Sequence, residues 1–265
     1  MEKQFKEHNY WALVLGGSSG LGLASAIKLS KEGMNIIVVH RNSRSEMELI
    51  NNSFNEIIAN KVKFISFNID AGNPEKRMQA ISELKIQLGD DKIKCLIHSI
   101  AKGNLKAMVD ESQPELQKDD FMITLEHMAI SLYEWTKNLF KENVFATDTR
   151  IISFTSEGNT KAYKNYSAVS VAKAALEAIS RNIALEFAPY GIRSNCIQAG
   201  VTDTRSLRLI PGSDKMKEIA LSRNPFGKIT TPEDVADVVY LLCKDEAKWI
   251  NGTVIPVDGG ESIVA

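Results

Sequence analysis

Tyr166 and Lys173 lie seven positions apart in the segment YSAVSVAK, and no other pair of residues in this chain suggests a reaction so directly. An α-helix would place them about two turns apart on one face. A tyrosine hydroxyl, with a pKa of about 10, needs a neighbouring cation to exchange protons at neutral pH. A lysine ammonium about 4 Å away contributes roughly 4 kcal/mol, enough to lower a phenol pKa by about three units. The pair predicts a proton-donating tyrosine; the alternative is an amphipathic helix whose Tyr and Lys flank the core.

A glycine-rich turn near the start of the chain is the first element that could position this pair. The apolar run YWALVL leads into GGSSGLG and then into LASAIKLSKEG, which has helical periodicity. Glycines let a turn approach a pyrophosphate closely, and the following helix N-terminus offers free N–H groups and a positive dipole end. The spacing G-x3-G-x-G is not the commonest dinucleotide fingerprint, and a structural turn with a glycine cap is the alternative. The cofactor-binding residues expected here are Gly16, Ser18, Ser19, Gly20, Leu21 and Gly22.

The residues after the next apolar run, NIIVVH, indicate which dinucleotide would fit. A dehydrogenase that prefers NAD would place an acidic residue there to receive the ribose 2′-hydroxyl. This chain has His40, Arg41 and Arg44 instead. Because a guanidinium suits the 2′-phosphate of NADP, we expect NADPH as the cofactor, with Arg41 at its phosphate. The alternative is a basic loop in water.

The composition is that of an ordinary globular protein: 265 residues, 44% hydrophobic and 25% charged, with a formal net charge of −1. We expect one domain over residues 1–265. Without a basic, aromatic-rich stripe, nucleic-acid binding is not expected, and no apolar stretch reaches the roughly 20 residues that cross a bilayer. The polar start MEKQFKEHNY predicts no signal peptide. The three cysteines form no C-x-x-C pair, so neither disulfides nor a metal site are expected, and a reducing, cytoplasmic location fits best.

Short apolar runs alternate with longer helical stretches along the whole chain. This alternation predicts an α/β fold with a single doubly wound parallel sheet of about seven strands and helices on both faces. Residues 202–227 interrupt the pattern after the sixth run with charged and small residues, prolines and glycines. A segment of this kind near the carboxyl ends of the strands predicts a mobile substrate lid, with an ordinary surface insertion as the alternative. The runs are YWALVL, NIIVVH, VKFISFNI, IKCLIHSI, RIISFTS, GIRSNCIQ and GTVIPV.

Taken together, these motifs resemble the short-chain dehydrogenase/reductase family over nearly the whole chain, which implies its Rossmann-like fold. GGSSGLG resembles the family's cofactor loop, Asp70 in FNID resembles the acidic residue at the adenine, and VDGG with Asp258 resembles the closing strand and turn. The commoner members use Tyr-x3-Lys, with a serine seventeen residues before the lysine. Here Ser156 holds that serine position and Val169 holds the tyrosine position, because the tyrosine lies almost one helical turn upstream, at Tyr166.

The displaced spacing, Tyr-x6-Lys, resembles a divergent branch of the family, the enoyl-acyl carrier protein reductases. HSIA is similar to this branch's segment after the fourth strand, and QAGVTDT to its segment after the sixth. The branch often has a second tyrosine ten residues before the first, but here Ser156 stands there, as in a sub-branch that uses NADPH. The resemblance implies cofactor contacts from Ser99 and Gly200, from Val201 and Thr202 at the nicotinamide, and from Thr204 at the diphosphate.

Two long helices are expected around the site, over residues 116–140 and 166–187. The first contains TLEHMAISLYEW, which lacks the asparagine of the commoner ketone reductases. We interpret its Glu126 and His127 as packing or interface residues and not as an acid–base pair. Both helices carry more apolar positions than one sheet face needs, and the family resemblance implies a homodimer or homotetramer.

The resemblance implies reduction of the carbon–carbon double bond of an enoyl thioester, carried by acyl carrier protein, in fatty-acid or related acyl biosynthesis. Donors must then stabilise the charge that develops on the thioester oxygen. Tyr166 is implied as the main donor, Lys173 as the residue that binds the nicotinamide ribose, and Ser156 as a second donor. The alternative for Ser156 is a strand-end serine bonded to local backbone. For the whole protein, a 3-oxoacyl thioester or other carbonyl reductase and a non-catalytic dinucleotide sensor are the alternatives.

Overall fold

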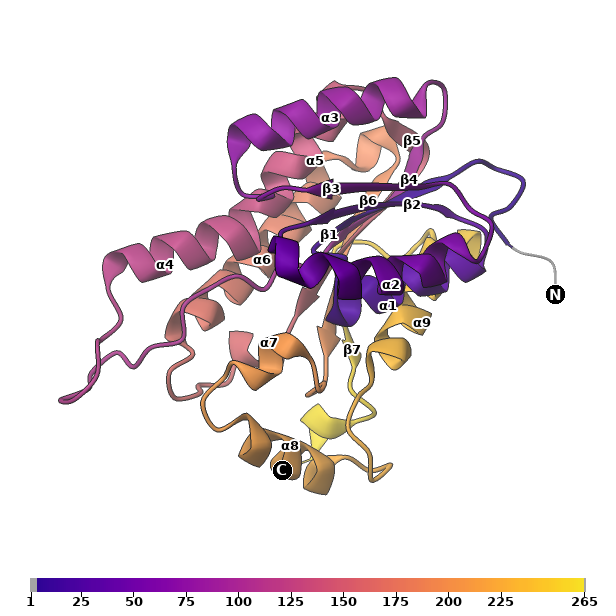
Figure 1. Cartoon of the computed structure of the whole chain (residues 1–265). Coiled ribbons are helices and arrows are strands. Elements are labelled where there is room, and N and C mark those ends of the chain that lie inside the picture. Colours follow the sequence, from indigo (N-terminus) through magenta and orange to yellow (C-terminus); the bar gives the residue numbers. More distant parts are fainter. Residues whose placement is uncertain (1–3, 265) are drawn as a thin grey trace.

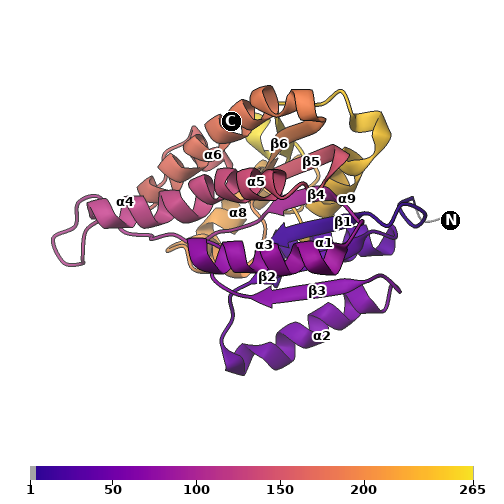
Figure 2. The same ribbon diagram turned by 90° about the horizontal axis from the view of Figure 1, so that it is seen from above.

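A seven-stranded parallel sheet forms the centre of the protein, which a computed structural model describes over residues 4–264. The strand order is β3-β2-β1-β4-β5-β6-β7, and Figure 2 shows the strands side by side. Each of the seven apolar runs forms a strand, so the predicted doubly wound α/β fold is confirmed. The strands are β1 (Trp11–Leu15), β2 (Asn35–His40), β3 (Phe64–Asn68), β4 (Ile93–His98), β5 (Phe145–Thr155), β6 (Ile192–Ala199) and β7 (Val254–Val257).

Helices cover both faces of the sheet (Figure 1). One face packs against α1 (Gly20–Lys31), α2 (Met47–Ile58) and α9 (Pro232–Cys243). The other face packs against α3 (Pro74–Leu88), α5 (Ser131–Lys141) and α6 (Ser167–Glu186). Since both faces are covered, the central strands β1, β2 and β4 are buried at every position, which is why they appear as continuous apolar runs in the sequence.

Strand β1 shows how the two hydrophobic cores are built from one strand. Trp11, Leu13 and Leu15 pack with the layer of α3, α5 and α6. Ala12 and Val14 pack with the layer of α1, α2 and α9. Successive side chains of a strand point to opposite faces, so a single apolar run supplies both cores. Because β1 is anchored in both cores, the glycine loop that follows it is fixed between the two helix layers.

The long helix expected over residues 116–140 is interrupted in the structure. It consists of α4 (Lys118–Leu125), a π-helical turn (Glu126–Ile130) and α5. A π-helical turn inserts an extra residue and changes which side chains face the neighbouring elements, and such turns are frequent at functional sites. The helix expected over residues 166–187 is confirmed as α6.

The segment expected as a lid, residues 202–227, contains the short helices α7 (Arg205–Arg208) and α8 (Ser213–Arg223). It follows β6 directly and lies toward the carboxyl ends of the strands (Figure 1). Five 3-10 turns complete the described residues: Arg44–Glu46, Glu157–Asn159, Ala188–Tyr190, Asp245–Ala247 and Glu261–Ile263. Within residues 4–264, no helix combines the length and the apolar character that crossing a membrane requires.

Candidate active site

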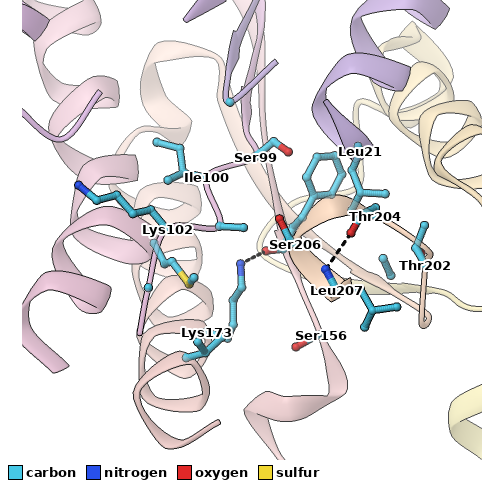
Figure 3. Close-up of a pocket in the computed structure, with 18 of the residues that line it drawn as sticks. Leu21, Ser99, Ile100, Lys102, Ser156, Lys173, Thr202, Thr204, Ser206 and Leu207 are labelled. Carbon is cyan, nitrogen blue, oxygen red and sulfur yellow. Dashed lines mark hydrogen bonds between the residues drawn. The ribbon is translucent and has the colours of Figure 1, made fainter. Parts of the chain in front are cut away.

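A cavity of about 640 Å³ opens at the carboxyl ends of the strands, and its walls come from segments far apart in the sequence. Figure 3 shows Lys173 reaching into it between one segment that carries Ser99, Ile100 and Lys102 and another that carries Thr202, Thr204 and Leu207. The strand order reverses between β1 and β4, and open α/β sheets bind their ligands at such a point. The predicted site residues on the cavity wall are Gly16, Ser18, Ser19, Gly20, Leu21, Arg41, Asp70, Ser99, Ser156, Tyr166, Lys173, Gly200, Val201, Thr202 and Thr204.

The glycine loop owes its shape to two glycines with different roles. Gly16 has a φ of +82°, and a Cβ at this position would collide with the main-chain carbonyl of Ser99. A Cβ at Gly22 would lie 2.5 Å from the carbonyl oxygen of Gly16. Gly22 is buried and does not line the cavity, so the structure shows a packing role for this glycine, and its cofactor contact stays a prediction.

The loop presents the N-terminus of α1 to the cavity. Ser19 is the N-cap residue, but its side chain makes no capping hydrogen bond within the described part of the chain. The first turn of α1 also contains no acidic residue. The first N–H groups of a helix lack partners within the helix and carry a partial positive charge. Together with the glycine cradle, this end fits a dinucleotide diphosphate.

At the far end of the cavity, cationic side chains converge on one carboxylate. Arg41 donates to Asp70 Oδ2 at 2.6 Å, and Lys102 reaches the same oxygen at 3.2 Å. Burial acts to raise the Asp70 pKa, but the Gly72 backbone N–H, Arg41 and Lys102 together hold the pKa of this carboxyl well below its ordinary range. Asp70 is therefore a permanent anion that already engages the arginine expected to bind a 2′-phosphate.

His127 belongs to this cluster, which corrects its interpretation as a packing or interface residue. Its Nε2 lies 2.8 Å from Lys102 Nζ and 3.5 Å from Asp70 Oδ1, and the side chain lines the cavity. His127 lies within the π-helical turn Glu126–Ile130. Arg44, by contrast, is exposed and does not line the cavity.

Tyr166, Ser156 and Lys173 line the opposite end of the cavity, which we call the catalytic end after the role predicted for these residues. Tyr166 is the N-cap residue of α6, and its hydroxyl lies 3.4 Å from Ser156 Oγ. Lys173 is buried and donates to the main-chain carbonyl of Phe154 at 2.7 Å. The seven-residue spacing therefore places both predicted side chains on the cavity wall, as expected.

The pKa values at this end are governed by burial. Burial raises the pKa of the Tyr166 phenol, and the bond with Ser156 opposes this only in part. Burial also lowers the pKa of Lys173 to about 8, against the charges of Cys196 and Glu177, which raise it. The expectation that Lys173 depresses the phenol pKa is therefore wrong for this structure. The raised pKa keeps the Tyr166 phenol protonated at neutral pH, so its hydroxyl is able to donate a hydrogen bond.

The local backbone explains how the tyrosine can occupy its displaced position. Asn165 has a φ of +63°, in the left-handed region that asparagine tolerates, and turns the chain into α6 at Tyr166. A Cβ at Gly158 would lie 2.6 Å from Tyr166 Cε1, so this glycine makes room for the ring. Val169, at the commoner tyrosine position, is buried in an apolar cluster with Met128.

The segment after β6 already uses its polar groups within the chain. The Val201 N–H donates to Glu261 Oε2 at 3.1 Å, and the Thr204 hydroxyl accepts the Leu207 N–H at 3.3 Å as the N-cap of α7. The backbone of Val201 was expected to hold the nicotinamide, and in this structure its N–H is already bonded to Glu261. Glu261 was not predicted as a site residue, although it directly follows the VDGG motif. Burial raises the pKa of its carboxyl.

His98 of the HSIA segment lies beneath the site. Its Nε2 lies 2.7 Å from Ser131 Oγ, and the ring is buried. Burial, together with the charge of Lys173, lowers the His98 pKa to about 3. The ring is therefore neutral at working pH, and it does not line the cavity.

Comparisons with known proteins agree with this geometry. A family model described as Enoyl-(Acyl carrier protein) reductase matches residues 16–262. The chain is 30% identical over 252 residues to a tropinone reductase homolog of Arabidopsis thaliana, covering 95% of this chain and 92% of the relative. It is 26% identical over 267 residues to 1-cyclohexenylcarbonyl-CoA reductase of Streptomyces collinus, covering 100% and 91%. The solved enoyl-[acyl-carrier-protein] reductase (NADH) of Aquifex aeolicus is similar with a TM-score of 0.83 and 25% identity, covering 97% of this chain and 98% of that one.

Proposed function

This chain belongs to the short-chain dehydrogenase/reductase family, whose members are NAD(P)-dependent oxidoreductases, and we propose that it reduces the carbon–carbon double bond of an enoyl thioester with NADPH. The observation that carries the proposal is the place of Tyr166. Its hydroxyl faces the cavity beside Ser156 from the residue before α6, while apolar Val169 holds the commoner tyrosine position. The relatives named as enoyl-[acyl-carrier-protein] reductase and 1-cyclohexenylcarbonyl-CoA reductase support it.

The chemistry explains why the position of the hydroxyl matters. In ketone reduction, the oxygen that is protonated is attached to the carbon that receives hydride. In enoyl reduction, the oxygen that gains charge lies two carbons further along the conjugated system. A phenol that has moved almost one helical turn meets a different oxygen, and the displaced Tyr166 suits the second arrangement.

A bound reduced nicotinamide would supply the hydride to the β-carbon, and a proton from solvent at the α-carbon would complete the saturated thioester. Tyr166, whose raised pKa keeps its proton in place, donates a hydrogen bond to the thioester oxygen as negative charge develops there. Ser156, 3.4 Å from that hydroxyl, is the second donor. Lys173, protonated below its pKa of about 8, holds the ribose hydroxyls and orients the reacting carbon.

NADPH is preferred in this proposal because Arg41 lines the cavity directly after β2, at the position where an NAD-preferring dehydrogenase would carry an acidic residue for the ribose 2′-hydroxyl. The acyl group is proposed to be carried by acyl carrier protein, in a cytoplasmic, homo-oligomeric enzyme of acyl biosynthesis. Residues 202–227 are proposed as its lid, because Leu207, Ile210 and Met216 of this segment line the cavity.

The proposal is tested by following NADPH oxidation with crotonyl and acetoacetyl thioesters, each on acyl carrier protein and on coenzyme A. We expect kcat/KM for crotonyl reduction to exceed that for acetoacetyl reduction by at least about a hundredfold, or ~2.7 kcal/mol in transition-state free energy. Faster reduction of acetoacetyl thioesters would establish a carbonyl reductase instead. The better of the two carriers identifies the donor of the acyl group.

A further inference from the structure

Glu157, the residue after Ser156, lines the cavity and joins side chains of its own loop to a residue of the segment after β6. The hydroxyl of Tyr163 donates to Glu157 Oε1, and Lys161 Nζ lies 2.6 Å from Oε2. Arg223 approaches both carboxylate oxygens, with Nη1 3.3 Å from Oε1 and Nη2 3.5 Å from Oε2. Arg223 is the last residue of α8, in the segment proposed as the lid.

Tyr163 connects this carboxylate to Tyr166. The two rings pack edge to face, with centroids 6.0 Å apart and an interplanar angle of 83°. The Tyr166 N–H also donates to the Tyr163 carbonyl at 3.3 Å. Since edge-to-face aromatic pairs have a preferred geometry, a Tyr163 that is fixed at its hydroxyl restricts the orientation of the neighbouring ring.

Arg223 is itself held firmly. Its Nη2 donates to the Glu261 carbonyl at 2.9 Å and its Nε donates to the Val264 carbonyl at 3.3 Å. Only 18% of the side chain is exposed. Burial acts to raise the pKa of Glu157, but Lys161, Tyr163 and Arg223 lower it to about 2, so the carboxylate that Arg223 binds is ionised throughout the working range.

We propose that Arg223 is a positioning residue for the reaction: from the lid helix α8 it holds Glu157, which fixes Tyr163 against Tyr166 and so sets the hydroxyl of Tyr166 in the cavity. The role of Tyr166 as donor rests on the function proposed above. Lys161 also binds Glu157, but it lies in the same loop and so does not connect Glu157 to the lid. Arg223 lies 66 residues from Glu157 in the chain, so its bond ties α8 to the loop that carries Glu157.

The first test observes Tyr166 without any substrate. The protein is labelled with ¹³Cζ-tyrosine, and the Tyr166 signal is assigned by its loss in Tyr166→Phe. We expect Arg223→Met and Tyr163→Ala to shift or broaden this signal. Glu157→Gln, which keeps the size of the side chain, should also shift or broaden the Tyr166 signal. This variant replaces Arg223→Met in the test if Arg223→Met does not fold.

A matched control comes from a second lid arginine. Arg208 pairs with Asp203 at 2.9 Å, is 65% exposed and does not line the cavity. Arg208→Met therefore also removes a lid ion pair, but we expect the Tyr166 signal to stay where it is. An unchanged Tyr166 signal in folded Arg223→Met and Glu157→Gln proteins, or an equal change in Arg208→Met, would overturn the proposal.

The second test is kinetic. Arg223→Met should lower kcat for the crotonyl thioester about ten- to a hundredfold, because small misplacements of a catalytic group have effects of this size, and should leave the dissociation constant of NADPH within about twofold. Arg223→Lys, which keeps the charge, should restore part of kcat. Loss of NADPH affinity in parallel with kcat would show a merely structural role. If neither thioester is reduced by the parent protein but the Tyr166 signal responds to Arg223→Met, the proposed function fails while the positioning role stands.

Discussion

The two ends of the cavity handle charge in opposite ways. At the far end, Arg41 and Lys102 pair with Asp70 while 60% and 40% of their side chains remain exposed. At the catalytic end, Lys173 is buried and bonds to a neutral main-chain carbonyl. At the first end, the Gly72 N–H and the two cations lower the Asp70 pKa against the effect of burial. At the second end, burial raises the Tyr166 pKa and lowers the Lys173 pKa.

This difference separates recognition from chemistry. An exposed ion pair contributes little to stability, so Arg41 can exchange Asp70 for a phosphate at small cost while Lys102 remains on the carboxylate. A partly buried phenol with a raised pKa keeps its proton, and a donor to a developing oxyanion requires this. Changes at the far end should therefore alter cofactor selection, and changes at the catalytic end should alter turnover.

The largest effect should come from Tyr166→Phe. We expect kcat for the crotonyl thioester to fall about a hundred- to a thousandfold, because the hydroxyl that stabilises the thioester oxygen is removed. NADPH affinity, measured by fluorescence titration, should change less than about twofold. Lys173→Ala is the comparison, since it should weaken both turnover and NADPH binding. A Tyr166→Phe protein with parental activity would contradict the assignment of this residue.

The next effect concerns the far end. Arg41→Ala should weaken NADPH binding about ten- to a hundredfold, because a charge-assisted contact with the 2′-phosphate is lost, and should leave NADH binding nearly unchanged. Arg44→Ala is the matched control, because Arg44 is exposed and lies off the cavity wall. Equal losses for the two cofactors in Arg41→Ala would remove Arg41 from cofactor selection.

A smaller effect should appear in the pH profile. Lys173 is charged below its lowered pKa of about 8, so kcat/KM for NADPH should fall as pH rises through that value, about tenfold by one unit above it. Tyr166, with its raised pKa, stays protonated over this range. Lys173→Arg, if thermal unfolding shows it folded, should move the decline to higher pH, since a guanidinium keeps its charge. An unmoved inflection would assign the titration to another group.

The smallest effect should be that of salt. Raising sodium chloride from about 50 to 500 mM should weaken NADPH binding roughly threefold, because exposed charges are screened. NADH, which lacks the 2′-phosphate, is the control ligand and should respond less. Saturated kcat should stay constant, since the catalytic end is buried. An equal response of both cofactors would mean that the phosphate does not meet the exposed cations.

Much of the site could be predicted from the sequence because it depends on local geometry. Seven residues bring Tyr166 and Lys173 onto one side of α6, and a glycine turn between strand and helix forms the cradle after β1. The apolar runs predicted every strand because a parallel sheet covered on both faces needs continuous apolar segments. These features involve residues that are near one another in the chain.

What only the tertiary structure decided involves contacts between distant segments and the burial that they create. His127, in the π-helical turn, lies beside Lys102, and Arg223, in α8, lies beside Glu157. No spacing in the sequence predicts either contact. The pKa of Tyr166 shows the same division most clearly. The sequence determined that Lys173 would lie two helical turns from Tyr166. In the structure, burial raises the pKa of the Tyr166 phenol, and Lys173 donates to the Phe154 carbonyl. Desolvation depends on everything that packs around a group, including residues distant in the chain, so the sequence alone did not decide this pKa.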